Sequence, residues 1–271
     1  MVQINIQQIQ AIENAMLKET IEILNRHNIP FYMCCGSVLG TIRHQGPIPW
    51  DTDMDLLIPS HLLEQARDYL EAELSDRFCI DDLKNNKKYK NMFPRVALPH
   101  SPSDTLHIDL FPLIGLPDDE KEQHKICDII MKRQKTFVVH KHMRQNIRHS
   151  NFVKNAIGLA IEIFCSPFSK KTLWKQYQKI VMKYPYDGAK FVMNGCGHYG
   201  AKNIFEKEVF GTPVWKPYCD MQVPIPEQWD FYLKRYYKDY MSFPPEEERN
   251  FWLAFKLDID ERDFEKVKDL L

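Results

Sequence analysis

Apolar residues near the start of the chain recur with the spacing of one helix face. The repeat consists of Ile6, Ile9, Ile12, Met16, Ile23 and Leu24. Pro30 ends this pattern, so we predict a helix over about residues 5–28. The run FYMCCG that follows is short, aromatic and apolar, which is typical of a buried strand. SVLGTIRH then predicts a short helix, entered through a turn at Gly36.

Further apolar runs predict a sheet with helices around it. DMDLLI resumes as a strand after the rigid loop GPIPW, and Ser60 is expected to cap a helix over about residues 61–74. RFCIDD, NMFPRVAL and TLHIDLFPL are three more strand candidates. After Pro117 the pattern becomes helical and increasingly basic to about residue 185, and aromatic residues, prolines and glycines are frequent from Tyr184 onward.

The order of these elements favours an α+β fold. We expect a mixed sheet of about five strands in which FYMCCG, DMDLLI and HIDLFPL lie side by side. Residues 1–117 would form the catalytic core, and residues 118–271 a mostly helical, aromatic-rich elaboration that completes the donor and acceptor site.

Composition excludes several classes of protein. Because 36 basic residues balance 37 acidic ones, no overall charge attracts nucleic acid. The N-terminus lacks the pattern of a signal peptide, and no apolar run is long enough to span a bilayer. The seven cysteines are mostly scattered, which favours reduced thiols in a cytosolic protein. A zinc site formed by Cys196 and His198 with Cys165 and Cys219 is the alternative, although no CxxC spacing supports it.

Asp51, Asp53 and Asp55 occupy alternate positions at the entrance to an apolar strand. Because successive strand side chains point to opposite faces, the three carboxylates project together. Like charges held close repel unless a cation lies among them, and an all-oxygen ligand set suits Mg²⁺, with Mn²⁺ as the alternative. The competing interpretation is a solvated acidic turn after PIPW.

Two other segments extend this site. Asp109 lies between Ile108 and Leu110 in HIDLFPL, so it faces away from the apolar side and is expected to meet the triplet from a neighbouring strand. Gly36 and Ser37 lie where a strand turns into a helix, whose N-terminal N–H groups favour a phosphate. A phosphate turn followed by carboxylates on two strands is the layout of the nucleotidyltransferase fold.

Three ordered blocks resemble the LicD family of phosphotransferases, which is related to fukutin-type proteins. The blocks are CCGSVLGTIRHQGPIPWDTDMDLLIP, HIDLFPLIGLP and VPIPEQWDFYLKRYYKDYMSFPPEEER, which together cover residues from about 30 to 250. The resemblance implies a transferase that moves a phospho-alcohol, typically phosphocholine, from a CDP-alcohol such as CDP-choline. The implied acceptor is a sugar hydroxyl of a cell-surface glycan, such as a lipid-linked precursor of teichoic acid, capsule or lipopolysaccharide.

The resemblance also implies roles for single residues. Asp53 and Asp55 would be catalytic and hold Mg²⁺, Asp51 would add a ligand, and Asp109 would bind the metal or accept a proton. Arg43, His44 and Arg95 are candidate phosphate clamps, and Trp50 would either pack or stack. Glu206 occupies a family-like position without an assigned role. Candidates for an aromatic cage around choline are Tyr199, Phe205, Trp215, Tyr218 and Trp229.

Alternatives remain open at this point. An ordinary nucleotidyltransferase would attack the α-phosphate of a nucleoside triphosphate, and a binding protein would keep the fold without catalysis. Basic residues flank the apolar run AIGLAIEIF, which indicates either a solvated helical face or a peripheral contact with the inner face of the cell membrane.

Overall fold

The protein is built around one mixed β-sheet. The computed structural model describes residues 1–86, 89, 91–102, 106–146, 170–196 and 199–271. Five strands run in the order β2 (Tyr32–Met33), β3 (Met54–Pro59), β6 (His107–Leu116), β5 (Arg95–Ala97) and β4 (Cys79–Asp81). β7 (Phe191–Asn194) pairs with β6, and β8 (Ile204–Glu206) pairs with β7. Only β3 and β6 run parallel among these pairs.

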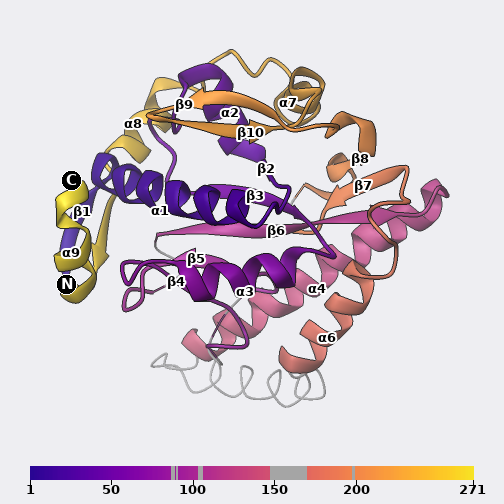
Figure 1. Ribbon diagram of the computed structural model, residues 1–271, viewed down its shortest axis with the longest axis horizontal. Helices are drawn as coiled ribbons and strands as arrows, with labels where there is room; N and C mark the ends of the chain where they lie inside the picture. Colours follow the sequence, from indigo (N-terminus) through magenta and orange to yellow (C-terminus); the bar gives the residue numbers. More distant parts are fainter. Residues whose placement is uncertain (87–88, 90, 103–105, 147–169, 197–198) are drawn as a thin grey trace.

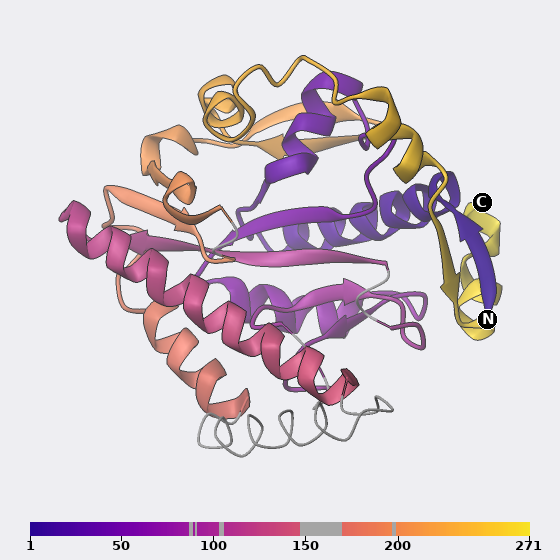
Figure 2. The ribbon, with the colours of Figure 1, turned by 180° about the vertical axis from the view of Figure 1, so that it is seen from behind.

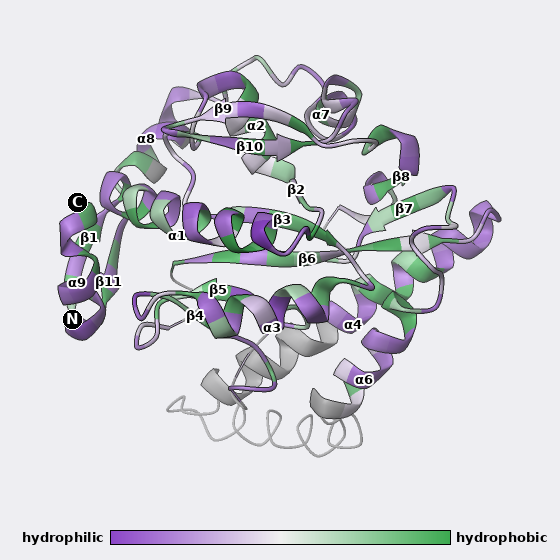
Figure 3. Ribbon diagram, viewed as in Figure 1, coloured by the Kyte–Doolittle hydropathy of each residue, from purple (hydrophilic) through white to green (hydrophobic). Residues whose placement is uncertain are grey.

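The middle of the sheet is enclosed on both faces. All ten residues of β6 are buried, and its sequence is an almost continuous apolar run, as expected for a strand covered on both sides. Figure 3 shows the hydrophobic residues concentrated on β3, β6 and β7. The predicted neighbourhood of FYMCCG, DMDLLI and HIDLFPL is confirmed by the order β2, β3 and β6.

Helices lie on opposite faces of the sheet. α1 (Ile6–Arg26) and α3 (Leu63–Glu73) cross the face turned to the viewer in Figure 1. α4 (Glu120–Asn146) crosses the other face, which Figure 2 shows from behind, and packs against α6 (Lys170–Val181). α2 (Cys35–His44) links β2 to the loop that carries the first aspartates. The opening helix predicted over about residues 5–28 is therefore confirmed.

Short strands and helices complete the chain beyond the sheet. β1 (Val2–Asn5) pairs with β11 (Lys256–Ile259), which brings the two ends of the chain together (Figure 1). β9 (Val214–Tyr218) and β10 (Met221–Ile225) form a separate two-stranded ribbon. The remaining described helices are α7 (Trp229–Tyr237), α8 (Glu246–Leu253), α9 (Glu261–Val267) and the 3₁₀ turns η1 (Gly200–Asn203), η2 (Lys207–Val209) and η3 (Lys268–Leu270).

The expected helix cap at Ser60 is wrong. α3 begins only at Leu63, and its N-cap residue Leu62 makes no side-chain capping bond. The Ser60 N–H instead donates to the Leu113 carbonyl at 2.9 Å, which continues the ladder between β3 and β6. Tertiary strand pairing has thus overridden a local capping signal.

The expected domain boundary at residue 117 stays a prediction. β7 and β8 come from the second part of the chain but extend the sheet of the first. The second part is therefore built directly onto β6, the central strand of the core.

The predicted peripheral contact with a membrane involves the apolar run AIGLAIEIF and the basic residues around it. AIGLAIEIF, at residues 156–164, lies outside the described residues. Within the described residues, no helix is both long and apolar enough to cross a bilayer.

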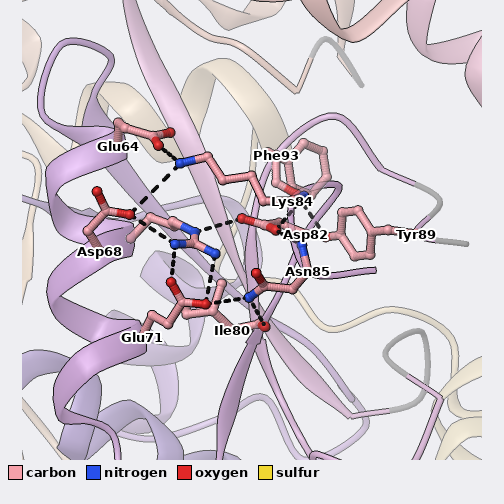
Figure 4. A network of polar contacts seen from close by, with 10 residues as sticks. Glu64, Asp68, Glu71, Ile80, Asp82, Lys84, Asn85, Tyr89 and Phe93 are labelled. Atoms are coloured by element: carbon pink, nitrogen blue, oxygen red, sulfur yellow. Dashed lines mark hydrogen bonds and ion pairs between the residues drawn. The ribbon is translucent and has the colours of Figure 1, made fainter. Parts of the chain in front are cut away.

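A buried arginine anchors the loop between β4 and β5 (Figure 4). The Arg67 side chain on α3 is only 5% exposed, and its Nε donates to Asp82 Oδ2 at 2.7 Å. Its two terminal nitrogens donate to Asp68 and Glu71 of the same helix. Asp82 Oδ1 in turn accepts the N–H groups of Lys84 and Asn85. The network fixes the start of the loop whose end, at residues 91–93, reaches the cavity described below.

Replacing Arg67 tests the importance of this anchor. We expect Arg67→Met to lower the free energy of unfolding by roughly 3–5 kcal/mol, because it leaves the Asp82 carboxylate buried without its cation. Lys268→Met is the control, since Lys268 pairs with Glu265 at the surface, and it should change stability little. Urea unfolding followed by circular dichroism measures both. Equal stability of the two variants would contradict the proposed role of the network.

Candidate active site

Four aspartates converge on one cavity of about 380 Å³. Asp51 and Asp53 lie in the loop before β3, Asp55 lies on β3, and Asp109 lies on β6. The parallel register pairs Asp55 directly with Asp109, so their side chains leave the same face of the sheet. The described residues that line the cavity are Cys35, Gly36, Asp51, Asp53, Asp55, Asn91, Met92, Phe93, Asp109, Phe111, Gln134, Cys196, Tyr199 and Tyr237.

The electrostatics of these carboxyl groups favour a cation. Loss of solvent, and then the charge of Asp53, raises the pKa of Asp51 well above its usual range. For Asp55, loss of solvent raises the pKa most, followed by Cys35, Asp53 and Asp109. Each charge among these groups is therefore costly until a positive charge arrives. An all-carboxylate wall of this kind fits a divalent cation with oxygen ligands, such as Mg²⁺.

Asp109 has a cationic partner within the protein. Both oxygens of its carboxylate accept from the Arg95 guanidinium, one from Nε and the other from Nη2 at 3.2 Å. His107 Nε2 lies 3.6 Å from Asp109 Oδ1. Burial raises the pKa of Asp109, and Arg95 opposes this rise. Arg95, predicted as a phosphate clamp, is thus placed as a buried partner of an aspartate.

The predicted phosphate turn supports the aspartates at close range. A Cβ atom on Gly36 would lie 2.9 Å from Asp51 Oδ2, so any other residue at this position would displace the carboxylate. The Ser37 hydroxyl accepts the Asp55 N–H at 3.0 Å, and the Ser37 N–H donates to the Cys34 carbonyl. The Cys35 N–H donates to the Tyr232 hydroxyl at 3.0 Å. The role of this turn as a phosphate site stays a prediction.

Three other motif residues lie together away from the cavity lining. Arg43 Nη1 donates to the carbonyls of Tyr240 and Ser242, and its Nε donates to His44 Nε2 at 3.0 Å. The guanidinium also lies 5.6 Å from the centre of the Trp50 ring. None of Arg43, His44 and Trp50 is among the described residues that line the cavity. They bind the segment that follows α7.

The remaining candidates from the sequence lie in the cavity, at the surface or in the hydrophobic core. Tyr199 lines the cavity together with Tyr237, Phe93 and Phe111. Trp215 is 42% exposed and meets the edge of Phe31, and Glu206 is exposed at the end of β8. Phe205 and Tyr218 are buried in the hydrophobic core, and Trp229 packs against it. Cys165 and His198 of the suggested zinc set lie outside the described residues.

The sequence analysis missed two residues of α1 that reach this site. Gln10 Nε2 donates to the carbonyls of Ile48 at 2.9 Å and Asp51 at 2.8 Å, which fixes the aspartate loop. Glu13, one helical turn further, is 1% exposed, and its Oε1 has no hydrogen-bond partner among the described residues. Burial, followed by Asp53 and Asp51, raises the pKa of Glu13 well above its usual range. A glutamate on the apolar face of an amphipathic helix was the available signal.

Comparison with known proteins relates the aspartate-bearing segment to a family. Residues 28–157 match the family model described as "LicD/FKTN/FKRP, nucleotidyltransferase domain". The chain carries a LicD-family domain. All four cavity aspartates lie within that LicD-family segment, whereas Gln10 and Glu13 precede it.

Individual relatives extend the match. The lipopolysaccharide cholinephosphotransferase LicD of Haemophilus influenzae is 24% identical over 244 residues, which cover 84% of this chain and 88% of that protein. An uncharacterized protein of Rickettsia prowazekii is 44% identical over 103 residues, covering 31% of this chain and 39% of that protein. A second uncharacterized protein, from Rickettsia typhi, is 44% identical over 41 residues. The similarity to LicD therefore extends well beyond the 28–157 segment.

The raised pKa of Asp55 predicts a pH-dependent gain in stability on its removal. In cation-free protein, ionisation of Asp55 opposes folding once the pH exceeds the pKa of the unfolded chain, and the penalty grows until the pH passes the higher folded value. Asp55→Asn should therefore raise the free energy of unfolding at pH 7, by about 1 kcal/mol or more.

The advantage of Asp55→Asn should shrink as the pH falls toward 4. Urea unfolding in a chelator, at a series of pH values, measures the difference from the unmodified protein. Asp258→Asn, at an exposed position of β11, is the matched control and should show no such trend. A pH-independent difference for Asp55→Asn would refute the electrostatic origin.

Proposed function

We propose that the protein is a metal-dependent transferase that moves phosphocholine from CDP-choline to a sugar hydroxyl of a surface glycan. The observation that carries the proposal is the convergence of Asp51, Asp53, Asp55 and Asp109 on one cavity within a LicD-family domain. The similarity to a lipopolysaccharide cholinephosphotransferase supports the class of group that is moved. A nucleotidyltransferase-like arrangement of the sheet belongs to the same proposal.

The aspartates would act on the diphosphate of the donor. Asp51, Asp53 and Asp55 would hold Mg²⁺ or Mn²⁺, which when bound neutralises the diphosphate and stabilises the leaving CMP. Asp109 lies opposite Asp55 in the register, and Arg95 holds both of its oxygens. Asp109 would bind the cation near the acceptor or accept the proton of the acceptor hydroxyl, since burial raises its pKa and Arg95 opposes this rise.

Aromatic side chains in the same cavity suit the choline group. A quaternary ammonium donates no hydrogen bonds and is recognised by aromatic faces near negative charge. Phe93 and Phe111 meet edge to face at 4.6 Å, and Tyr199 and Tyr237 line the same cavity. Aromatic rings and carboxylates therefore share one cavity, which could hold both ends of a phosphocholine group. Its volume lies within the usual range for a ligand pocket.

A panel of donors tests the reaction. Incubation with CDP-choline, CDP-ribitol, CDP-glycerol or CTP in the presence of Mg²⁺ should release CMP from CDP-choline, with water taking the phosphocholine group in place of the sugar hydroxyl. Asp53→Asn and Asp55→Asn should each lower this rate by on the order of 100-fold or more, because each removes charge that holds the cation. Asp258→Asn should keep the full rate. Normal turnover in either active-site variant would refute the site.

The same panel separates the second candidate function. The matching family model is described as a nucleotidyltransferase domain. Enzymes of that class attack the α-phosphate of a nucleoside triphosphate. Pyrophosphate released from CTP, without CMP from any CDP-alcohol, would establish that alternative. The lipid-linked sugar acceptor rests on the family resemblance, whereas the peripheral membrane contact rests on the basic residues that flank AIGLAIEIF.

The aromatic wall predicts selectivity among donors. We expect Tyr199→Leu to weaken binding of CDP-choline by about 5-fold, corresponding to a cation–π contribution of about 1 kcal/mol, and to change binding of CDP-glycerol little. Tyr199→Phe keeps the ring and should bind CDP-choline almost normally. Isothermal titration with Mg²⁺ present measures the binding of both donors to both variants and to the unmodified protein. Equal weakening for both donors would assign Tyr199 to structural support instead.

A further inference from the structure

Two adjacent cysteines and one of the cavity aspartates form a compact group of potential metal ligands. The sulfur atoms of Cys34 and Cys35 and a carboxylate oxygen of Asp55 all lie within 4.8 Å of one another. Cys34 follows β2, and its N–H donates to the Asp55 carbonyl at 3.0 Å. Pairing of β2 with β3 thus holds the thiols beside the aspartate.

An unusual backbone conformation brings both thiols to the same place. Successive side chains in an extended segment point to opposite sides. Cys34 is extended, with φ −140° and ψ 170°, whereas Cys35 has φ 50° in the left-handed region. A cysteine in this conformation is strained, whereas glycine would adopt it without strain. The hydrogen bond from the Cys35 N–H to the Tyr232 hydroxyl fixes the turn.

The ligand chemistry differs from that of the other aspartates. Thiolates select Zn²⁺ and similar thiophilic ions, whereas carboxylates alone suit Mg²⁺. We propose that Cys34, Cys35 and Asp55 form a binding site for a thiophilic divalent cation, of which Zn²⁺ is the type. Cys35 and Asp55 line the open cavity, so an ion can reach the group from solvent.

Cys196 provides further sulfur on the same wall. It lines the cavity with Cys35 and Asp55, and its N–H donates to Asn194 Oδ1 at 2.8 Å. Asn194 Nδ2 lies 4.0 Å from Cys35 Sγ, so one amide contacts two of the cysteines. Structural zinc sites are four-coordinate, with sulfur, nitrogen or oxygen ligands, and Cys196 is a candidate for the fourth protein ligand because it lines the same cavity.

The shared aspartate makes the two kinds of cation compete. Asp55 belongs both to the thiol group and to the carboxylate wall assigned to Mg²⁺. An ion held by Cys34 and Cys35 would therefore withdraw Asp55 from the donor diphosphate. This sharing predicts that Zn²⁺ inhibits the protein and that excess Mg²⁺ relieves the inhibition only poorly. This consequence rests on the proposed function, whereas binding of the thiophilic ion does not.

Cobalt spectroscopy tests the site without any assay of activity. Titration of metal-free, reduced protein with Co²⁺ should produce a thiolate charge-transfer band in the near ultraviolet that saturates at one ion per chain. Cys34→Ser and Cys35→Ser should each weaken the band at least several-fold, and excess Mg²⁺ should leave it in place. Cys219→Ser, at an exposed position, is the matched control and should keep it. Absence of the band, or its persistence in both serine variants, would overturn the proposal.

Protection from alkylation covers the case in which a serine variant fails to fold. In the unmodified protein, Zn²⁺ should slow modification of Cys35 by iodoacetamide and leave Cys219 unaffected, as followed by peptide mass spectrometry. Equal rates with and without Zn²⁺ would overturn the site. Once CMP release has been established, Zn²⁺ should inhibit the unmodified protein at concentrations at least 10-fold lower than it inhibits Cys35→Ser. Equal inhibition of both would refute the competition at Asp55 while leaving a positive cobalt result intact.

Discussion

The rest of this structure depends on overcoming the mutual repulsion of the clustered carboxylates. The register of β3 and β6 places Asp55 directly opposite Asp109. The next residue along each strand, Leu56 or Leu110, is completely buried. A slip of one residue would turn the aspartates into the core and the leucines into the cavity, at a cost no surface contact could offset. The hydrophobic core therefore holds together charges that would separate if left free.

Contacts from distant parts of the chain refine this arrangement. Gln10 holds two carbonyls of the aspartate loop from α1, and Arg95 holds both oxygens of Asp109 from β5. Gly36 removes the one Cβ that would collide with Asp51. The same motif carries Arg43 and Trp50, which bind the segment after α7 instead of the cavity. A single stretch of sequence thus supplies three of the four carboxylates and also holds the segment that follows α7.

The features that could be predicted are those with a local signal. Alternating aspartates before an apolar run predicted the strand at β3, and the apolar HIDLFPL predicted its neighbour. What escaped depends on partners far along the chain. Arg43 donates to a carbonyl 197 residues away, and Ser60 joins a strand ladder because Leu113 lies beside it. Glu13 looked like one more residue of an amphipathic helix until its burial beside Asp51 and Asp53 was known.

The pairing of β1 with β11 has a consequence for the order in which the protein can assemble during synthesis. Asn5 is the last residue of β1, the partner of Lys256 and the N-cap of α1, where its side chain accepts the Gln8 N–H. The strand that anchors the start of α1 thus finds its partner only after residue 256 has emerged from the ribosome. Until then α1, which carries the glutamine and glutamate beside the aspartates, lacks its anchor. The hydrogen bonds from Gln10 to the aspartate loop therefore gain this support only once β11 is in place.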